Sequence, residues 1–181
     1  MTNAELAILS LVAEVPRHGY EIEQTIEERG MREWTEIGFS SIYYLLKKLE
    51  KTGLVKSQLI PTQGRGSARR VYQITAKGSE ALGEATLEAL SQPKQSYPSI
   101  LLGIANLPLL SPEQTESALR FYREGLIERV EQVAAQAESQ RPLPDHVEML
   151  FDYSLMTLES EKNWVEKVIR KMEDEQSEKN I

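Results

Sequence analysis

The stretch that decides the fold is residues 41–55, which read SIYYLLKKLEKTGLV. Its apolar side chains recur at Ile42, Leu45, Leu46 and Leu49, which is the spacing of one face of an α-helix. A serine at position 40 or 41 can cap the start of this helix, and Gly53 can end it. The pattern therefore predicts a helix over about 40–52 with these residues on or beside its outward face: Ser41, Tyr44, Lys47, Lys48 and Lys51.

Two shorter helices are predicted before this one. Residues 4–13 are apolar on nearly every side, so we expect that helix to be covered on both sides, with a second subunit as one possible cover. Pro16 ends it, Gly19 opens a second helix, and Gly30 is a plausible end of that helix. Three short helices in succession suggest a helix-turn-helix domain.

The pattern after Gly53 changes from helical to extended. Residues 54–60 and 69–74 are strand-length and rich in β-branched or aromatic residues, and the glycines between them permit the positive φ of a hairpin tip. We expect a two-stranded wing with Arg65 at its tip and Arg69 and Arg70 on its return strand. Thr75 then caps a fourth helix that runs to about residue 90.

The second half of the chain is predicted to be helical. Residues 91–98 are polar, contain two prolines and form the best boundary, which divides the chain into domains at 1–90 and 99–181. A helix should begin at Ser111, where a capping-box pattern is followed by Pro112, and the last helix should begin at Asp145. Along that last helix an apolar seam recurs in steps of four and three, and we expect it to pack against a second copy of the chain. We predict that dimerisation uses Leu6, Leu9, Val147, Phe151, Leu158, Val165, Val168 and Met172.

Charge is distributed unevenly along the 181 residues. The chain has a formal net charge of −7, but residues 47–77 hold eight basic side chains and one acidic one. Such a stripe is the footprint of a polyanion-binding surface, although a solvated charge cluster explains it about as well. The chain has no cysteine and two isolated histidines, so we expect no disulfide, no metal site and no cofactor. Its apolar runs are too short to span a membrane, and we expect a soluble, cytoplasmic protein.

The N-terminal residues carry a family resemblance. The strings PRHGYEI at 16–22, SIYYLLKKLEKTGLV at 41–55 and RRVYQITAKG at 69–78 together resemble the PadR family of bacterial transcriptional regulators. The remainder resembles the longer type of this family in helix content and length. The resemblance implies a mainly α-helical winged helix-turn-helix homodimer, usually a repressor, that in several members responds to a small aromatic effector. Tyr44 departs from the family pattern, in which proline is common, so a base preference cannot be carried over.

The residue types suggest how such a domain would contact a duplex. The second helix of a helix-turn-helix pair presents its first residues to the major groove, and lysines one turn further on reach phosphates. We predict that double-stranded DNA is contacted by Tyr20, Ser40, Ser41, Tyr43, Tyr44, Lys47, Lys48, Arg65, Arg69 and Arg70. Tyr43 can instead be buried against the second helix, Ser41 can be a cap only, and only one of Arg69 and Arg70 can readily face DNA.

Other interpretations stay open. Trp34 and Trp164 can line an effector pocket, although large aromatic residues at helical spacing are more often core. The alternative function is a protein-interaction adaptor whose basic stripe meets an acidic partner. An enzyme is the weakest option, because no GxGxxG, P-loop, HExxH or GxSxG element occurs.

Overall fold

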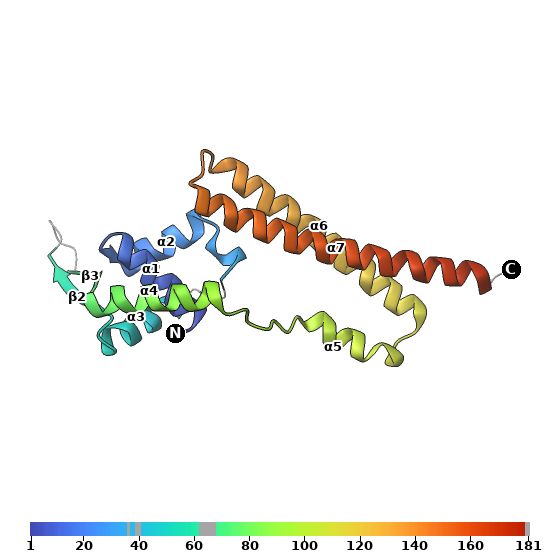
Figure 1. Ribbon diagram of the computed structural model, residues 1–181, viewed down its shortest axis with the longest axis horizontal. Helices are drawn as coiled ribbons and strands as arrows, with labels where there is room; N and C mark the ends of the chain where they lie inside the picture. Colours follow the sequence, from blue (N-terminus) through green and yellow to red (C-terminus); the bar gives the residue numbers. More distant parts are fainter. Residues whose placement is uncertain (36, 39–40, 62–67, 180–181) are drawn as a thin grey trace. The chain divides into compact units, whose positions relative to one another are not determined.

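The computed structural model describes residues 1–35, 37–38, 41–61 and 68–179, and Figure 1 shows the course of the chain. The chain divides into two compact units, Met1–Gln95 and Ser96–Ile181, and each is described by itself. No helix within the described ranges is both long enough and apolar enough to cross a membrane.

The N-terminal unit contains four α-helices among its described residues. They are α1 (Asn3–Glu14), α2 (Gly19–Glu28), α3 (Ser41–Lys51) and α4 (Ala76–Ser91), with a short 3-10 helix η1 (Met31–Glu33) after α2. The Thr2 hydroxyl accepts from the Glu5 N–H at 3.2 Å and caps α1. Gly30 and Gly53 adopt φ values of 60° and 76°, the left-handed conformation that glycine accepts without strain, so the predicted ends of α2 and α3 are confirmed.

A small antiparallel sheet completes this unit. Strands β2 (Val55–Ile60) and β3 (Arg69–Ile74) pair from Val55 opposite Ile74 to Ile60 opposite Arg69, as the predicted wing requires. The sheet has a third strand, β1 (Arg17–His18), on the other side of β3. β1 was not predicted, because a two-residue strand has no periodicity to detect.

The start of α4 is attached to the end of α3. The Thr75 hydroxyl donates to the carbonyl oxygens of Gly53 and Leu54 at 2.8 and 3.1 Å, and the Lys77 Nζ donates to the Thr52 carbonyl oxygen at 2.9 Å. Gly78 lies so close to this turn that a Cβ atom there would be 2.0 Å from the Leu54 carbonyl oxygen. A side chain at position 78 would therefore force the α3–α4 junction apart.

The core of the N-terminal unit encloses α1. Ile8, Leu9, Leu11 and Val12 are each no more than 1% exposed and pack with side chains of α2, α3 and the sheet. The prediction that Leu9 contributes to dimerisation is therefore corrected, because its own unit already covers it. Leu6 is half-buried and keeps part of its surface.

The C-terminal unit is helical throughout its described length. It comprises α5 (Ser99–Ala105), the 3-10 helix η2 (Leu107–Leu109), α6 (Pro112–Ser139) and α7 (Asp145–Lys179). The predicted capping box of α6 is present: the Ser111 hydroxyl accepts from the Gln114 N–H at 3.2 Å, and the Gln114 side chain accepts from the Ser111 N–H at 2.9 Å. The predicted starts of α6 and α7 are confirmed.

Helices α6 and α7 run antiparallel and side by side (Figure 1). Leu126 and Val133 of α6 are buried with Leu158, Val165 and Ile169 of α7. The apolar seam of α7 was predicted to meet a second copy of the chain, and for Leu158 and Val165 this is wrong, because α6 of the same chain covers them. The other four predicted seam residues are half-buried: Val147, Phe151, Val168 and Met172.

Candidate nucleic-acid interface

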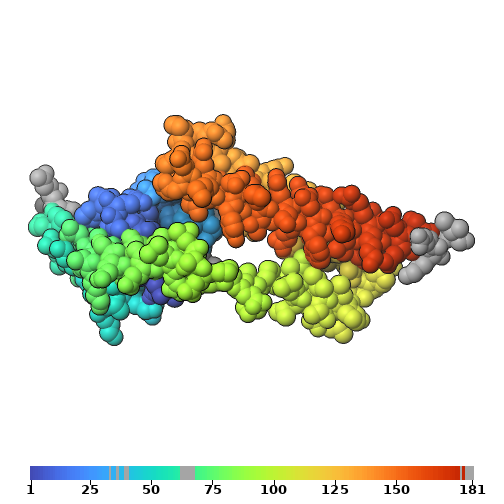
Figure 2. All heavy atoms as spheres, in the orientation of Figure 1, coloured from blue at the N-terminus to red at the C-terminus, as the bar shows by residue number. Residues whose placement is uncertain are grey.

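Helix α3 has one buried face and one exposed face. Ile42, Leu45, Leu46 and Leu49 point into the core, as their spacing predicted. Tyr43 and Tyr44 on the other side are 50% and 67% exposed, and Lys47 is exposed one turn further on. Figure 2 shows α3 and β2, in blue-green and teal, at the surface of the N-terminal unit. The outward face of α3 is therefore free to meet a large partner.

The ring of Tyr43 rests on the start of α2. A Cβ atom at Gly19 would lie 2.6 Å from the Tyr43 Cε1 atom, so only glycine leaves room for the ring in this position. Tyr43 is thus both packed on α2, as the alternative interpretation held, and half open to solvent. Gly19 thus allows the Tyr43 ring, and with it the Tyr43 hydroxyl, to take this position, a role that was not predicted for Gly19.

A surface hollow of about 570 Å³ brings several predicted site residues together. Tyr20, which is 65% exposed, and Tyr43 line it with Arg69 and Arg70 of β3. His18 also lines it, and its Nδ1 atom lies 3.1 Å from the Arg70 carbonyl oxygen. Four predicted residues that are far apart in the sequence therefore form one continuous surface.

The two arginines of β3 have different surroundings. The Arg70 Nη1 donates to the Ser57 hydroxyl at 2.9 Å and lies 3.7 Å from the Glu50 carboxylate. The side chain of Arg69 is exposed, and its guanidinium makes no hydrogen bond or ion pair with any residue that the structure describes. Of the two, Arg69 is the arginine whose guanidinium has no partner among the described residues.

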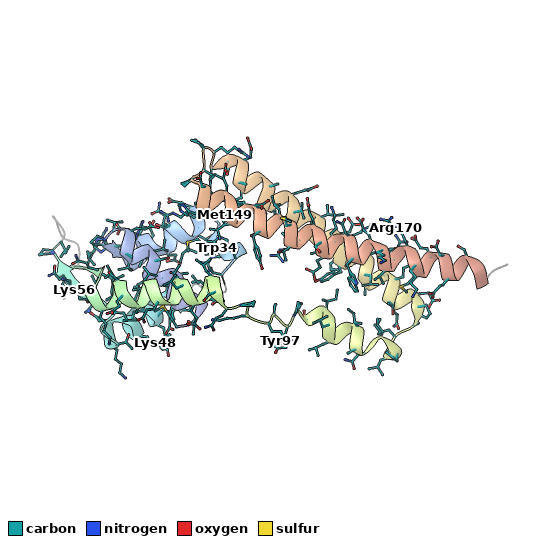
Figure 3. All side chains as sticks on the ribbon, viewed as in Figure 1. Trp34, Lys48, Lys56, Tyr97, Met149 and Arg170 are labelled. Atoms are coloured by element: carbon teal, nitrogen blue, oxygen red, sulfur yellow. The ribbon has the colours of Figure 1, made fainter. Side chains whose placement is uncertain are left out.

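The two lysines of α3 also differ. The Lys48 Nζ lies 2.5 Å from the Glu5 carboxylate of α1, whereas Lys47 makes no ion pair with a described residue. Glu5 is 7% exposed, and its hydrogen bond with Lys48 is the largest cause that holds the pKa of this carboxyl below its ordinary value. The same contact raises the pKa of the Lys48 ammonium. Figure 3 labels Lys48 on α3.

Some predicted site residues remain less open or outside the described ranges. The Ser41 hydroxyl donates to the Gly38 carbonyl oxygen at 2.5 Å, so its proton is not available to another acceptor. Ser40 and Arg65 lie outside the described residues. Glu5 was missed as the partner of Lys48, although the Thr2-x-x-Glu5 capping pattern marks it as an ordered carboxylate.

A second candidate site lies in the C-terminal unit. Trp164 lines a cavity of about 280 Å³ between α5, η2, α6 and α7. Trp34 does not line it, because Trp34 follows η1 in the N-terminal unit, where it is 44% exposed (Figure 3). No group of three or more histidine, aspartate or glutamate side chains that could hold a metal ion occurs in the described part of the chain.

Three features define the N-terminal unit as a DNA-binding winged helix-turn-helix. These are helices α2 and α3, the paired strands β2 and β3, and an exposed basic and aromatic face on α3. Residues 8–84 match the model of the transcriptional regulator PadR-like family. Residues 8–84 therefore form a domain of this family, which consists of transcriptional regulators. No curated protein matches the sequence.

Solved structures of this family share the fold along the length of the chain. Bacillus subtilis PadR in complex with operator DNA is 19% identical, with a TM-score of 0.77 over 93% of this chain and 98% of that one. The same protein in complex with p-coumaric acid is 17% identical, with a TM-score of 0.73 over the same shares. The PadR-like regulator BC1756 from Bacillus cereus is 15% identical, with a TM-score of 0.71 over 95% of this chain and 97% of that one.

Proposed function

We propose that this protein is a repressor that binds a pseudo-palindromic operator as a homodimer. The observation that carries the proposal is the outward face of α3, where Tyr43, Tyr44 and Lys47 are exposed. A helix in this position of a winged helix-turn-helix enters the major groove with its first residues at the base edges. The related Bacillus subtilis PadR, whose structure contains operator DNA, supports this role.

Each part of this surface has a role that follows from its chemistry. Tyr43 and Tyr44 offer hydroxyls and ring faces to base edges and thymine methyls. The Ser41 hydroxyl oxygen can still accept a hydrogen bond there, and the sequence predicts the same role for Ser40, which lies outside the described residues. Lys47, Arg69 and Tyr20 bind phosphates, because the two cations have no partner among the described residues and all three side chains are exposed. Arg65 lies outside the described residues; the sequence predicts it at the tip of the wing, and we propose that it enters the minor groove, which favours arginine. Lys48 and Arg70 act mainly through their contacts with Glu5 and Glu50.

Dimerisation requires a surface other than the seam that α6 covers. Met149, Tyr153 and Met156 lie on neighbouring turns of α7 and are 71%, 74% and 64% exposed. An exposed apolar stripe of this kind marks an interaction surface, and a second copy of the chain would cover it. Two copies then place their α3 helices in major grooves about 34 Å apart or a multiple of it.

Selection of bound duplexes from a random pool, followed by footprinting, tests this function. We expect two half-sites on one face of the duplex and a single population of dimers in light scattering. The double substitution Met149→Glu and Tyr153→Glu should give folded monomers with weaker operator binding, because two charges would enter the interface. A lack of preference for duplex over an acidic protein in competition would instead favour an adaptor.

We also propose that a small effector controls operator binding. The cavity beside Trp164 is the site, and the structure of Bacillus subtilis PadR with p-coumaric acid supports a small-molecule effector. The effector can change operator affinity only by the difference between its affinities for the two conformations of the dimer. Titration of the protein–operator complex with candidate effectors, read as release of labelled duplex, tests this control.

A further inference from the structure

We propose that the cavity beside Trp164 binds an aromatic cation and discriminates against aromatic carboxylates, with Glu161 as the counter-charge. This inference rests on the proposed effector function and names the chemical class of the effector. It concerns residues of the C-terminal unit only. Three features carry it: the size and apolar lining of the cavity, the position of one carboxylate, and the absence of a basic residue from the described lining.

The cavity is enclosed mainly by aliphatic side chains. Ile100 and Ile104 of α5, with Leu107 and Leu110 beyond it, form one side, and the opposite side comes from α6 and α7. A protein cavity of about 150 Å³ lined by aliphatic and aromatic side chains holds benzene. The volume of about 280 Å³ therefore has room for two fused aromatic rings. Trp164 is 42% exposed and offers part of its indole to such a ring system.

One carboxylate lies at the border of the cavity. Tyr122 lines the cavity, and its hydroxyl donates to the Glu161 Oε1 at 2.7 Å. Glu161 itself lines an adjoining, more open hollow that shares Ile100, Ile104 and Trp164 with the cavity. Tyr153 and Met156 of the proposed dimer surface also line this hollow, so a second copy on that surface would lie at its outer side. Burial, with a smaller contribution from Glu161, raises the pKa of the Tyr122 hydroxyl to about 12. Tyr122 is therefore a neutral donor, and the negative charge of the pair belongs to Glu161.

No cation among the described residues lines either hollow to balance that charge. The described residues around the two hollows include no lysine, arginine or histidine, and Glu161 makes no ion pair with a described residue. Lys171 lines a third hollow that shares Leu119 and Val168 with the cavity, but its Nζ lies 3.7 Å from the Glu175 carboxylate, which offsets its charge. The charge of Arg129 acts on Tyr122, but Arg129 lines neither hollow. Glu161 is half-buried, so its charge is less screened than that of a fully exposed carboxylate.

These surroundings favour one sign of ligand charge. An aromatic carboxylate would place a second negative charge near Glu161 and would lose its hydration without gaining an unpaired cation, because Lys171 is already paired with Glu175. An aromatic cation would gain the attraction of Glu161 and of the Trp164 ring face, which carries the negative part of the ring quadrupole. A neutral ring system of the same size would gain only the apolar contacts. The expected order of affinity is therefore cation, then neutral molecule, then anion.

Three probes with matched fused rings test this order: N-methylquinolinium, isoquinoline and 2-naphthoate, at pH 8. The full chain carries the substitution Trp34→Phe, which leaves Trp164 as its single tryptophan. Binding is measured by quenching of Trp164 fluorescence and by calorimetry. We expect N-methylquinolinium to bind at least tenfold more tightly than 2-naphthoate. Equal affinities, or tighter binding of 2-naphthoate, would overturn the proposal.

The substitution Glu161→Gln separates charge from shape. It should remove the preference for the cation and leave the affinity for isoquinoline unchanged. Glu159→Gln, on an exposed position of the same helix, is the matched control and should keep the preference. Circular dichroism reports whether each variant folds, and the comparison of probes on the parent chain does not depend on any variant.

Two further measurements distinguish this proposal from its premises. Insensitivity of Trp164 to all three probes in a dimeric sample would mean that a second copy fills the cavity, which overturns the proposal. Operator binding is also measured in the absence of any probe. A protein that does not bind DNA would then be recognised independently of whether the cavity binds the probes. A cation that binds as expected but does not release the operator would uphold the site and refute its regulatory role.

Discussion

The contrast between Lys47 and Lys48 gives a sharp test of the DNA-binding surface. The two lysines are adjacent in sequence and both are exposed, but within the described ranges only Lys48 is paired with a carboxylate. Each phosphate that a lysine neutralises contributes about 0.9 to the slope of log K against log salt. We expect Lys47→Ala to lower that slope by about 0.9, and Lys48→Ala to leave it nearly unchanged, because Glu5 already balances Lys48.

The size of the effect can be measured directly. When the salt concentration rises from about 50 to 200 mM, a variant that lacks one phosphate contact should lose about 3.5-fold less affinity than the parent protein. Fluorescence anisotropy with a labelled operator across a series of salt concentrations resolves such a difference. Glu5→Gln is the complementary variant: it releases Lys48 and should raise the slope. An equal fall in slope for both lysine variants, with no change for Glu5→Gln, would refute the reasoning.

Four other predictions concern the architecture. Gly19→Ala should displace the Tyr43 ring, because the new Cβ atom would lie 2.6 Å from the Tyr43 Cε1 atom, and should weaken operator binding more than it lowers the melting temperature. Gly78→Ala should lower the free energy of unfolding by about 1–3 kcal/mol, as measured in urea, because its Cβ would meet the Leu54 carbonyl group. Leu126→Ala should destabilise the α6–α7 pair by about 2–5 kcal/mol, and a cost below about 1 kcal/mol would contradict its burial at 4% exposure. Because the pKa values of Glu5 and Glu14 are lowered in the folded state, through Lys48 and Arg29 respectively, their stabilisation is present above pH 4.5 and is lost as pH falls below it. Thermal melts from neutral to acidic pH should show this loss, and Glu5→Gln should reduce it.

Most of the fold was readable from local chemistry. Capping residues such as Thr75 and Ser111, the glycines at the ends of helices and the spacing of apolar residues act over a few residues, so the sequence alone reveals them. The wing was predictable for the same reason. β1 was not, because its pairing with β3 depends on the chain reversal that brings Arg17 beside Tyr72.

The partners of individual side chains were much less predictable. The α7 seam was recognised, but periodicity shows only that a surface is buried and not which chain buries it. The contact between Glu5 and Lys48 joins residues on two helices, and the contact between Gly19 and Tyr43 joins α2 and α3. Contacts of this kind depend on tertiary packing, and they decide which lysine is available to a phosphate and where a tyrosine points.

The attachment of α4 to the end of α3 has a mechanical consequence. Three hydrogen bonds and the close approach of Gly78 to Leu54 join the two helices where α3 ends, so they cannot turn independently. We therefore expect a tilt of α4 to be accompanied by a tilt of α3. Because α4 is the last helix of the N-terminal unit, we expect a displacement of α4 to reach α3 through these contacts, and to reach α1 through the packing of α4 on α1.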